Sequence, residues 1–498
     1  MSAWRSNPPL LIHAYGLLLI PVVIGTGIAA VYSPAAAIGA SLIVMSGVSA
    51  LVFIKPSSLL VSLLGVISVL IVFPAFLPRV GNARQTAAVG GALDLRALSQ
   101  LAVFAMVAVI GCWLWMIAGA GLADLGRFPI NILVPYIALT TLSLMYTPEI
   151  GWPAYGLFKL VTVSLLLALV AKAITTVSGL KRLINVTMGA IVVVLAMYWL
   201  DIVRGAAGYE GGRYTTSWLH SNHATLMAVT LLLILTARYL ASSEPGSRFR
   251  IPLMGFAAIM ALITASKTAL GGAAFALAVT ILVIIVRKPS GASFARILLL
   301  SAGALGVLAY FLANNLGIVA HLLWYEEAVS DSASLTGRVP VWHTAISDTL
   351  GSPFTALLGH GYLSGFAIGL QGTYWTAQQA HNSFIQTFFD LGAFGVVLVS
   401  LLYLMAWAKA LRAFRLFDRR DPRWARALEL LAVLTLYTVV SMAQDIMGGT
   451  VESRTIVFLL ILCCIDLNLR VSPDVTPDAG GRADGERKGG LHENPARP

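Results

Sequence analysis

Long runs of apolar residues are the feature that most constrains this chain. A helix needs about 20 apolar residues to cross a bilayer, and about fourteen runs approach that length. Charged residues make up only 11% of the 498 residues, whereas a soluble domain carries about 25%. We therefore expect an all-α, polytopic membrane helix bundle of about 12–14 spans. The runs lie at residues 10–31, 35–54, 57–77, 98–121, 129–146, 156–178, 183–203, 221–241, 251–265, 268–287, 297–316, 384–407, 427–444 and 454–469.

Lysine and arginine lie mainly in the short loops between these runs and give the chain a net charge of +11. A nucleic-acid-binding protein gathers such residues on one water-facing patch, so we expect no nucleic-acid partner. Cytoplasmic loops of membrane proteins are rich in lysine and arginine. The loop from Arg412 to Arg426, with six arginines, is then cytoplasmic, and so are both termini.

The spans and loops divide the chain into five segments. The predicted segments are N-terminal transmembrane helices (1–128), central transmembrane helices (129–316), one long outer loop (317–383), C-terminal transmembrane helices (384–470) and a tail (471–498). The tail is poor in apolar residues, which is typical of disorder, and it follows a span on the cytoplasmic side.

The outer loop is too long to be a mere linker. It contains tryptophans, tyrosines and apolar stretches, so we expect it to be ordered and to fold back on the membrane. Within it the sequence predicts a helix that is capped by Ser334 or Thr336, runs through Arg338 and Trp342 to Leu350, and is stopped by Gly351 and Pro353.

Histidines gather on the predicted outer side, where His220, His223, His321, His343, His360 and His381 lie on or beside outer loops. An unperturbed imidazole titrates near pH 6.5, so it can take a proton from a hydroxyl. His381 stands immediately before a span, which makes it the strongest candidate for a general base. The alternative is that these histidines are interfacial hydrogen-bonding residues.

Positive charge is scarce on the same side. Arg338 is the one Lys or Arg of the long loop, Lys267 lies at an outer boundary, and Arg213 lies on another outer loop near Asn222 and His223. If these cations converge, they form a site for paired phosphates, which guanidinium binds through two parallel hydrogen bonds. The alternatives are a snorkelling role for Lys267 and a salt bridge from Arg338 to an acidic residue of the loop.

Motifs for other chemistries are missing from the sequence. There is no Asp-x-Asp pair, no Gly-Lys-Ser/Thr phosphate loop, no Gly-x-Gly-x-x-Gly and no metal-spaced cluster of histidine, cysteine and glutamate. Such motifs mark nucleotide and metal sites. We expect neither a metal nor a cofactor.

Three motifs stand in order along the chain: Gly337-Arg338-x-x-x-Trp342, Gly359-His360-Gly361, and His381-Asn382 heading a span. On these residues, the chain resembles the superfamily of O-antigen ligases and O-antigen and exopolysaccharide polymerases, which are bacterial membrane glycosyltransferases. The resemblance covers about residues 145–410.

The resemblance implies a GT-C-like fold in the bacterial cytoplasmic (inner) membrane with a periplasmic active site. The donor would be an undecaprenyl-diphosphate-linked oligosaccharide, passed to an acceptor sugar hydroxyl without metal or nucleotide. By position, His381 resembles the general base, and Arg338 resembles an arginine at the donor diphosphate. Lys267 stands where the family usually has arginine, and Arg213 is a further candidate for the diphosphate. Candidate substrate contacts are Asn222, His223, Trp342, His360, Tyr374, Trp375 and Asn382.

The acceptor stays open at the level of sequence. A polymerase adds the glycan to another lipid-linked repeat unit and can act with a chain-length regulator, whereas a ligase moves it to lipid A core or to a protein; we favour a polymerase. A lipid-linked solute transporter is the rival class, because Lys159, Lys172 and Asp201 lie in or near spans, and intramembrane charges are typical of transporters.

Overall fold

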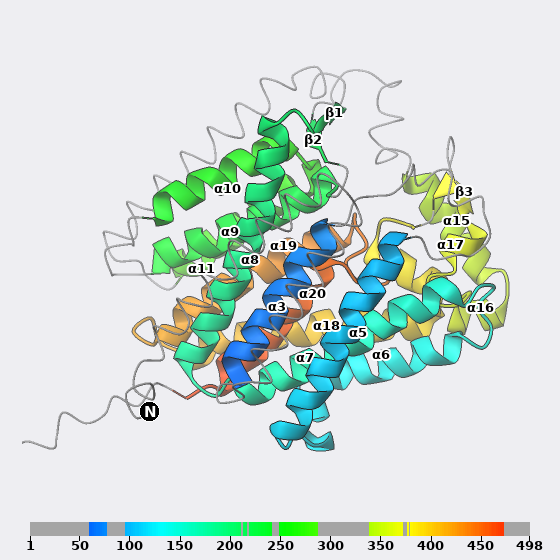
Figure 1. Ribbon diagram of the computed structural model, residues 1–498, viewed down its shortest axis with the longest axis horizontal. Helices are drawn as coiled ribbons and strands as arrows, with labels where there is room; N and C mark the ends of the chain where they lie inside the picture. The colour runs from blue at the N-terminus through cyan, green and yellow to red at the C-terminus, as the bar shows by residue number, and fades with distance from the viewer. Residues whose placement is uncertain are drawn as a thin grey trace, which may run out of the picture.

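The apolar runs fold as helices that pack side by side (Figure 1). The computed structural model describes residues 59–76, 95–210, 213–216, 219–241, 249–286, 338–371, 376–377 and 379–472. Seven helices in these ranges are long and apolar enough to cross a membrane, which confirms the all-α, polytopic membrane class. They are α5 (Leu95–Ile117), α7 (Gly151–Ala173), α8 (Val177–Val203), α9 (Ser221–Ala241), α11 (Lys267–Val286), α18 (Ser383–Leu416) and α19 (Pro422–Ser441).

The other described elements complete the bundle and its loops. They are α3 (Leu59–Phe76), the 3-10 helix η2 (Leu122–Gly126), α6 (Ile130–Ser143), α10 (Arg250–Thr264), α15 (Arg338–Leu350), α16 (Pro353–Leu358), α17 (Gly365–Ile368), α20 (Ser453–Arg470) and the strands β1 (Gly208–Glu210), β2 (Arg213–Thr215), β3 (Leu370–Gln371) and β4 (Thr376–Ala377). The strands form two small antiparallel hairpins, β1–β2 and β3–β4. The runs predicted at 10–31, 35–54 and 297–316 lie outside the described residues, so the total of 12–14 spans stays a prediction.

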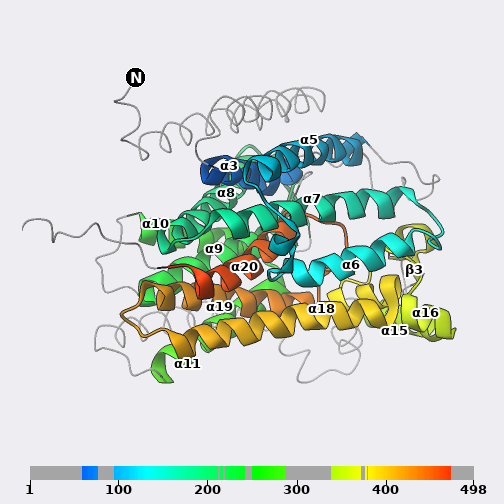
Figure 2. The same ribbon diagram turned by 90° about the horizontal axis from the view of Figure 1, so that it is seen from below.

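The helix α20 is the centre of the bundle (Figures 1 and 2). It packs against α3, α7, α8, α18 and α19, and its side chains are buried from Ser453 to Asn468. A helix that is buried all round is normally apolar, but α20 carries Arg454 and Asp466 into the interior. Each of these charges therefore needs a partner inside the bundle.

The long helix α18 begins at the site described below. It continues to Leu416, past the predicted end at 407, because Ala, Leu, Lys and Arg in its last turns are good helix formers. Its backbone leaves helical geometry at Gly392, where φ is 61°. A Cβ there would lie 2.3 Å from the carbonyl carbon of Leu357, so this glycine lets α16 lie directly against α18.

The outer-loop helix is confirmed, since α15 (Arg338–Leu350) passes through Trp342 and ends at Leu350 as predicted. Its predicted caps, Ser334 and Thr336, lie outside the described residues. The following turn is tied to α6, because the Tyr146 hydroxyl donates to Leu358 O at 2.7 Å and the backbone N–H of Tyr362 donates to Ser143 Oγ at 3.0 Å. Residues 338–371 are thus an ordered part of the predicted loop; the five segment boundaries themselves remain predictions.

Candidate active site

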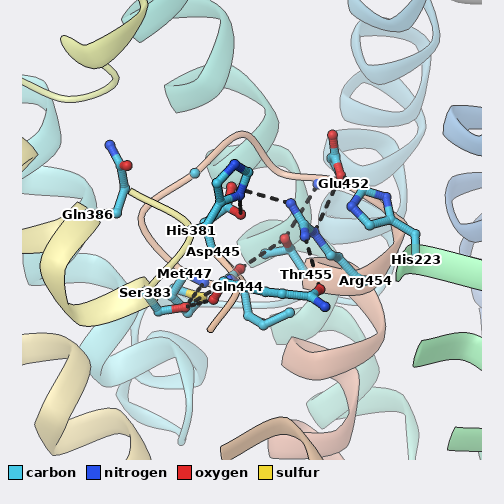
Figure 3. A network of polar contacts seen from close by, with 12 residues as sticks. His223, His381, Ser383, Gln386, Gln444, Asp445, Met447, Glu452, Arg454 and Thr455 are labelled. Atoms are coloured by element: carbon cyan, nitrogen blue, oxygen red, sulfur yellow. Dashed lines mark hydrogen bonds and ion pairs between the residues drawn. The ribbon is translucent and has the colours of Figure 1, made fainter. Parts of the chain in front are cut away.

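Polar side chains meet where α9, α18 and α20 begin (Figure 3). The connection between α19 and α20, residues 442–452, crosses this end of the bundle and is called the α19–α20 loop below. Ser383 holds the loop against the start of α18: its hydroxyl donates to Gln444 O at 3.0 Å and accepts the N–H groups of Ile446 at 2.8 Å and Met447 at 3.1 Å. The loop is thereby fixed relative to the residues that precede α18.

Asn382 caps α18. Its Oδ1 accepts the backbone N–H groups of Phe384 at 2.9 Å and Ile385 at 3.1 Å, and its Nδ2 donates to Met442 O at 2.8 Å. These bonds satisfy two of the N–H groups that a helix leaves unpaired at its start. Asn382 therefore connects the helix and the α19–α20 loop; a direct contact with substrate stays a prediction.

The backbone of Ala380, the residue before His381, is held through both its C=O and its N–H. The Trp342 indole N–H donates to Ala380 O at 2.7 Å, and Gln386 Oε1 accepts the Ala380 N–H at 2.6 Å. Gln386 is oriented in turn by Asp390, whose Oδ2 accepts its Nε2 at 3.0 Å. We call Trp342 and Gln386 the Ala380 clamp. It explains the spacing of the Gly-Arg-x-x-x-Trp motif, since α15 must reach the residue before the histidine.

The clamp holds His381 in an unusual backbone conformation. Its φ of 51° is left-handed, which costs a non-glycine residue about 1 kcal/mol, although His tolerates it better than most. The side chain is 39% exposed, and its Nδ1 lies 3.8 Å from Asp445 Oδ1. This separation is longer than a hydrogen bond and close enough for strong attraction to a protonated imidazole.

Asp445 is a buried carboxylate in the α19–α20 loop, 1% exposed. Burial acts to raise its pKa, but the Arg454 guanidinium and the His381 imidazole outweigh burial and hold the pKa below its usual range. Arg454 Nη2 lies 3.3 Å from Asp445 Oδ2. The group facing His381 is therefore a permanent anion across the physiological pH range.

The contacts continue beyond Arg454 to a second histidine (Figure 3). Arg454 Nε lies 3.4 Å from Glu452 Oε2, and the same oxygen lies 3.3 Å from His223 Nδ1 on α9. One buried arginine thus joins two carboxylate–histidine pairs, His381–Asp445 and His223–Glu452. This series of contacts connects His223, a residue predicted from the sequence, to the site.

Asp445, Glu452 and Arg454 were missed from the sequence. They stand within ten residues where the run 427–444 ends and the run 454–469 begins, on the predicted outer side, where positive charge is otherwise scarce. That local density of charge was the available signal.

Arg338 lies at the same loop. Its Nη1 donates to Ala443 O at 2.8 Å, two residues before Asp445, so Arg338 and His381 converge although they are far apart in the sequence. The predicted alternative was a salt bridge from Arg338 to an acidic residue of the loop, namely Glu326, Glu327 or Asp331, and these three residues lie outside the described residues.

The other predicted residues are distributed around this centre. His360 stacks on Phe389 with ring centroids 4.7 Å apart, and burial lowers its pKa, against an opposing effect of Asp348. Lys267 is exposed at the start of α11. Asn222 lies in the first turn of α9, where its backbone N–H donates to His220 Nδ1 at 3.1 Å.

Three predicted residues cannot be compared with the site. Tyr374 and Trp375 lie outside the described residues, and so does the side chain of Arg213, whose backbone belongs to β2. The convergence of Arg213 or Lys267 on Arg338 therefore stays a prediction. Among the described residues, no group of three or more His, Cys, Asp and Glu could hold a metal ion.

Two of the three charges that favoured a transporter, Lys159 and Lys172, have structural partners. Lys159 Nζ donates to Gln100 Oε1 at 2.9 Å, between α5 and α7. Lys172 donates to Gly119 O at 2.6 Å and lies 3.3 Å from Asp124 Oδ2. Both lysines are thus accounted for by helix packing, which weakens that class.

Residues 252–400 match the protein family described as O-Antigen ligase. A search of the curated proteins found no match. The matched segment contains Lys267, Arg338, Trp342 and His381. It supports the resemblance to the O-antigen ligase and polymerase superfamily, and with it a glycosyltransferase of that broad type in a membrane protein with several spans.

Proposed function

We propose that this protein is a metal-independent glycosyltransferase that moves an undecaprenyl-diphosphate-linked glycan to an acceptor sugar hydroxyl, and that it acts as a polysaccharide polymerase. The observation that carries the proposal is the convergence of His381, Asp445 and Arg338 around the α19–α20 loop. A base, an anion that stabilises the protonated base, and a cation for the leaving group are the parts that this reaction needs.

The chemical step uses each of these residues. The His381 imidazole takes the proton of the acceptor hydroxyl while the hydroxyl oxygen forms a bond to the anomeric carbon. The carbon–oxygen bond to the diphosphate breaks, and undecaprenyl diphosphate leaves with the electron pair. Asp445, 3.8 Å from Nδ1, stabilises the imidazolium until its proton passes to water.

Arg338 suits the donor side of the site. Its guanidinium lies beside the loop that carries Asp445, and a guanidinium binds diphosphate oxygens in a planar fork. As negative charge develops on the leaving diphosphate, a fixed cation stabilises it. Attack from the face opposite the leaving group then inverts the anomeric configuration.

The length of α18 supports a periplasmic position for the site. Beyond the break at Gly392 it continues for 24 residues to Leu416, which correspond to about 36 Å of helix, whereas the hydrocarbon core is about 30 Å thick. If Arg412 marks the cytoplasmic boundary, about 20 residues of helix reach the outer boundary near Gly392. His381 then lies beyond the hydrocarbon core on the outer side of the inner membrane, where a lipid-held diphosphate is available.

The test uses the full chain in nanodiscs with an undecaprenyl-diphosphate-linked repeat unit, with EDTA and without nucleotide. A ladder of products that is absent with His381→Ala supports the polymerase. Transfer only after lipid A core or a protein acceptor is added supports the second candidate, a ligase. Folded protein that transfers to no acceptor contradicts both.

A further inference from the structure

Two side chains of the polar network at the candidate site, those of His381 and Glu452, are partly exposed, whereas the charged side chains that connect them are buried. The His381 side chain is 39% exposed and that of Glu452 is 32% exposed, whereas Asp445 and Arg454 between them are 1% and 6% exposed. Glu452 is also the residue at the N-cap of α20, where the helix dipole stabilises an anion. Its carboxylate is therefore held at the surface of the same site as His381.

The charges at the two ends of the α19–α20 loop are opposite. Arg338 contacts the start of the loop at Ala443, and Glu452 ends it. Arg454, the cation next to Glu452, is buried and already lies between two carboxylates. A diphosphate is attracted to the Arg338 end and repelled from the Glu452 end.

We propose that Glu452 and His223 form the binding subsite for the acceptor sugar, where the Glu452 carboxylate binds ring hydroxyl groups beside the one that His381 deprotonates and His223 orients that carboxylate. This inference rests on the proposed function. A carboxylate accepts strong, charge-assisted hydrogen bonds from hydroxyls. The acceptor sugar presents uncharged hydroxyl groups, which the carboxylate attracts, whereas it repels the donor diphosphate. His223, 16% exposed and 3.3 Å from Glu452 Oε2, orients the carboxylate.

The subsite also predicts a preference among acceptors. A neutral sugar ring suits the Glu452 carboxylate, whereas a ring that carries a carboxylate or phosphate at this position is repelled by it. The donor glycan, which is held at the other end of the loop through its diphosphate, does not experience this selection.

The test compares the wild-type chain and its variants in nanodiscs. It measures how the transfer rate depends on acceptor concentration and, separately, on donor concentration. Glu452→Gln keeps the shape of the side chain but removes its charge. We expect its apparent KM for a neutral acceptor to rise about tenfold, since hydrogen bonds to charged groups are worth more than neutral ones. The KM for donor and the slow hydrolysis of donor by water should stay within about twofold of wild type.

His223→Gln should raise the same KM by a smaller factor, about threefold, because it only orients the carboxylate. Glu149→Gln is the matched control, since Glu149 is a carboxylate in the loop between α6 and α7, and it should leave both KM values unchanged. Binding of the acceptor glycan without donor, measured by calorimetry, should weaken in parallel in Glu452→Gln.

Other results would overturn the subsite. If Glu452→Gln lowers kcat, kcat/KM for the donor and the rate of donor hydrolysis together, Glu452 serves only as a counter-ion of Arg454. Unchanged kinetics with unchanged acceptor binding would exclude any role for it. Failure of the proposed function is distinguishable from failure of the subsite: a wild-type chain that transfers nothing contradicts the former, while weaker acceptor binding by Glu452→Gln than by wild type still supports the latter.

Discussion

The two ends of the helix bundle differ in the partners of their buried carboxylates. Where α18 and α20 end and α19 begins, each buried carboxylate contacts two cations. Glu429 lies 3.0 Å from Arg238 and also contacts Arg426; Asp466 is held likewise by Lys409 and Arg470. At the candidate active site, by contrast, two carboxylates share one arginine, and each faces a histidine.

This difference distinguishes an end of the bundle that stabilises helix packing from the end that contains the candidate active site. Carboxylates that have two permanent cations stay paired at any working pH, so they suit helix packing. An imidazole, unlike a paired lysine or arginine, can be neutral and accept a proton through a ring nitrogen. The partly exposed His381 therefore offers a proton acceptor at the end that contains the candidate site, whereas the cations that contact Glu429 and Asp466 at the opposite end are held in ion pairs. Substitutions at five positions test this comparison.

The largest expected effect is at His381. Replacing it by asparagine, which tolerates the left-handed backbone, should lower glycan transfer about 10³-fold because the general base is lost. His381→Ala should be equally inactive. Both should elute from size exclusion as the wild type does. Substantial transfer by either variant would rule out the base and with it the distinction between the two ends.

Asp445→Asn should lower kcat about 10²-fold. The amide keeps the shape but no longer stabilises the protonated imidazole, so the acid limb of the pH–rate profile should move to lower pH. Asp445 itself is ionised throughout, because Arg454 and His381 hold its pKa down against burial. A loss of kcat with an unmoved pH profile would argue for a merely structural carboxylate.

Arg338→Lys should reduce kcat/KM for the donor about 30-fold. Lysine keeps the charge but loses the fork that spans two phosphate oxygens and the bond to Ala443 O. The matched control is Arg426→Lys at the opposite end, which should leave donor kinetics unchanged. A wild-type rate for Arg338→Lys would leave only a point charge at this position.

Trp342→Phe should lower kcat about fivefold, the effect of losing one hydrogen bond. The variant removes the N–H that donates to Ala380 O and keeps an aromatic ring in place. KM for both substrates should change little, because Trp342 acts through the position of His381. A selective rise in acceptor KM would instead indicate that the indole contacts the sugar.

Glu429→Ala should have the smallest effect on activity and the largest on stability. It leaves Arg238 and Arg426 without their shared carboxylate, and breaking a buried pair in this way costs about 3–5 kcal/mol. Thermal unfolding in detergent should show the loss, whereas transfer per folded molecule should be unchanged. A catalytic defect without a stability defect would erase the contrast between the ends.

The sequence by itself determined the membrane class and several local elements. Apolar length predicts a span because the hydrocarbon core excludes charge and unpaired backbone groups, and α9 follows its predicted run residue for residue. The end of α15 at Leu350 was equally predictable from Gly351 and Pro353. His381 and Arg338 could also be singled out, since a histidine heading a span and a solitary outer arginine are visible without a fold.

Only the tertiary structure decided which residues join them. Asp445 lies 64 residues after His381, and His223 lies 229 residues before Glu452, so no local pattern predicts these pairs. They form because α9, α18 and α20 pack with their first turns at one end, which depends on the burial of α20 among its neighbours. Apolar patterning specifies that helices pack, but the contacts between their polar ends depend on how they pack.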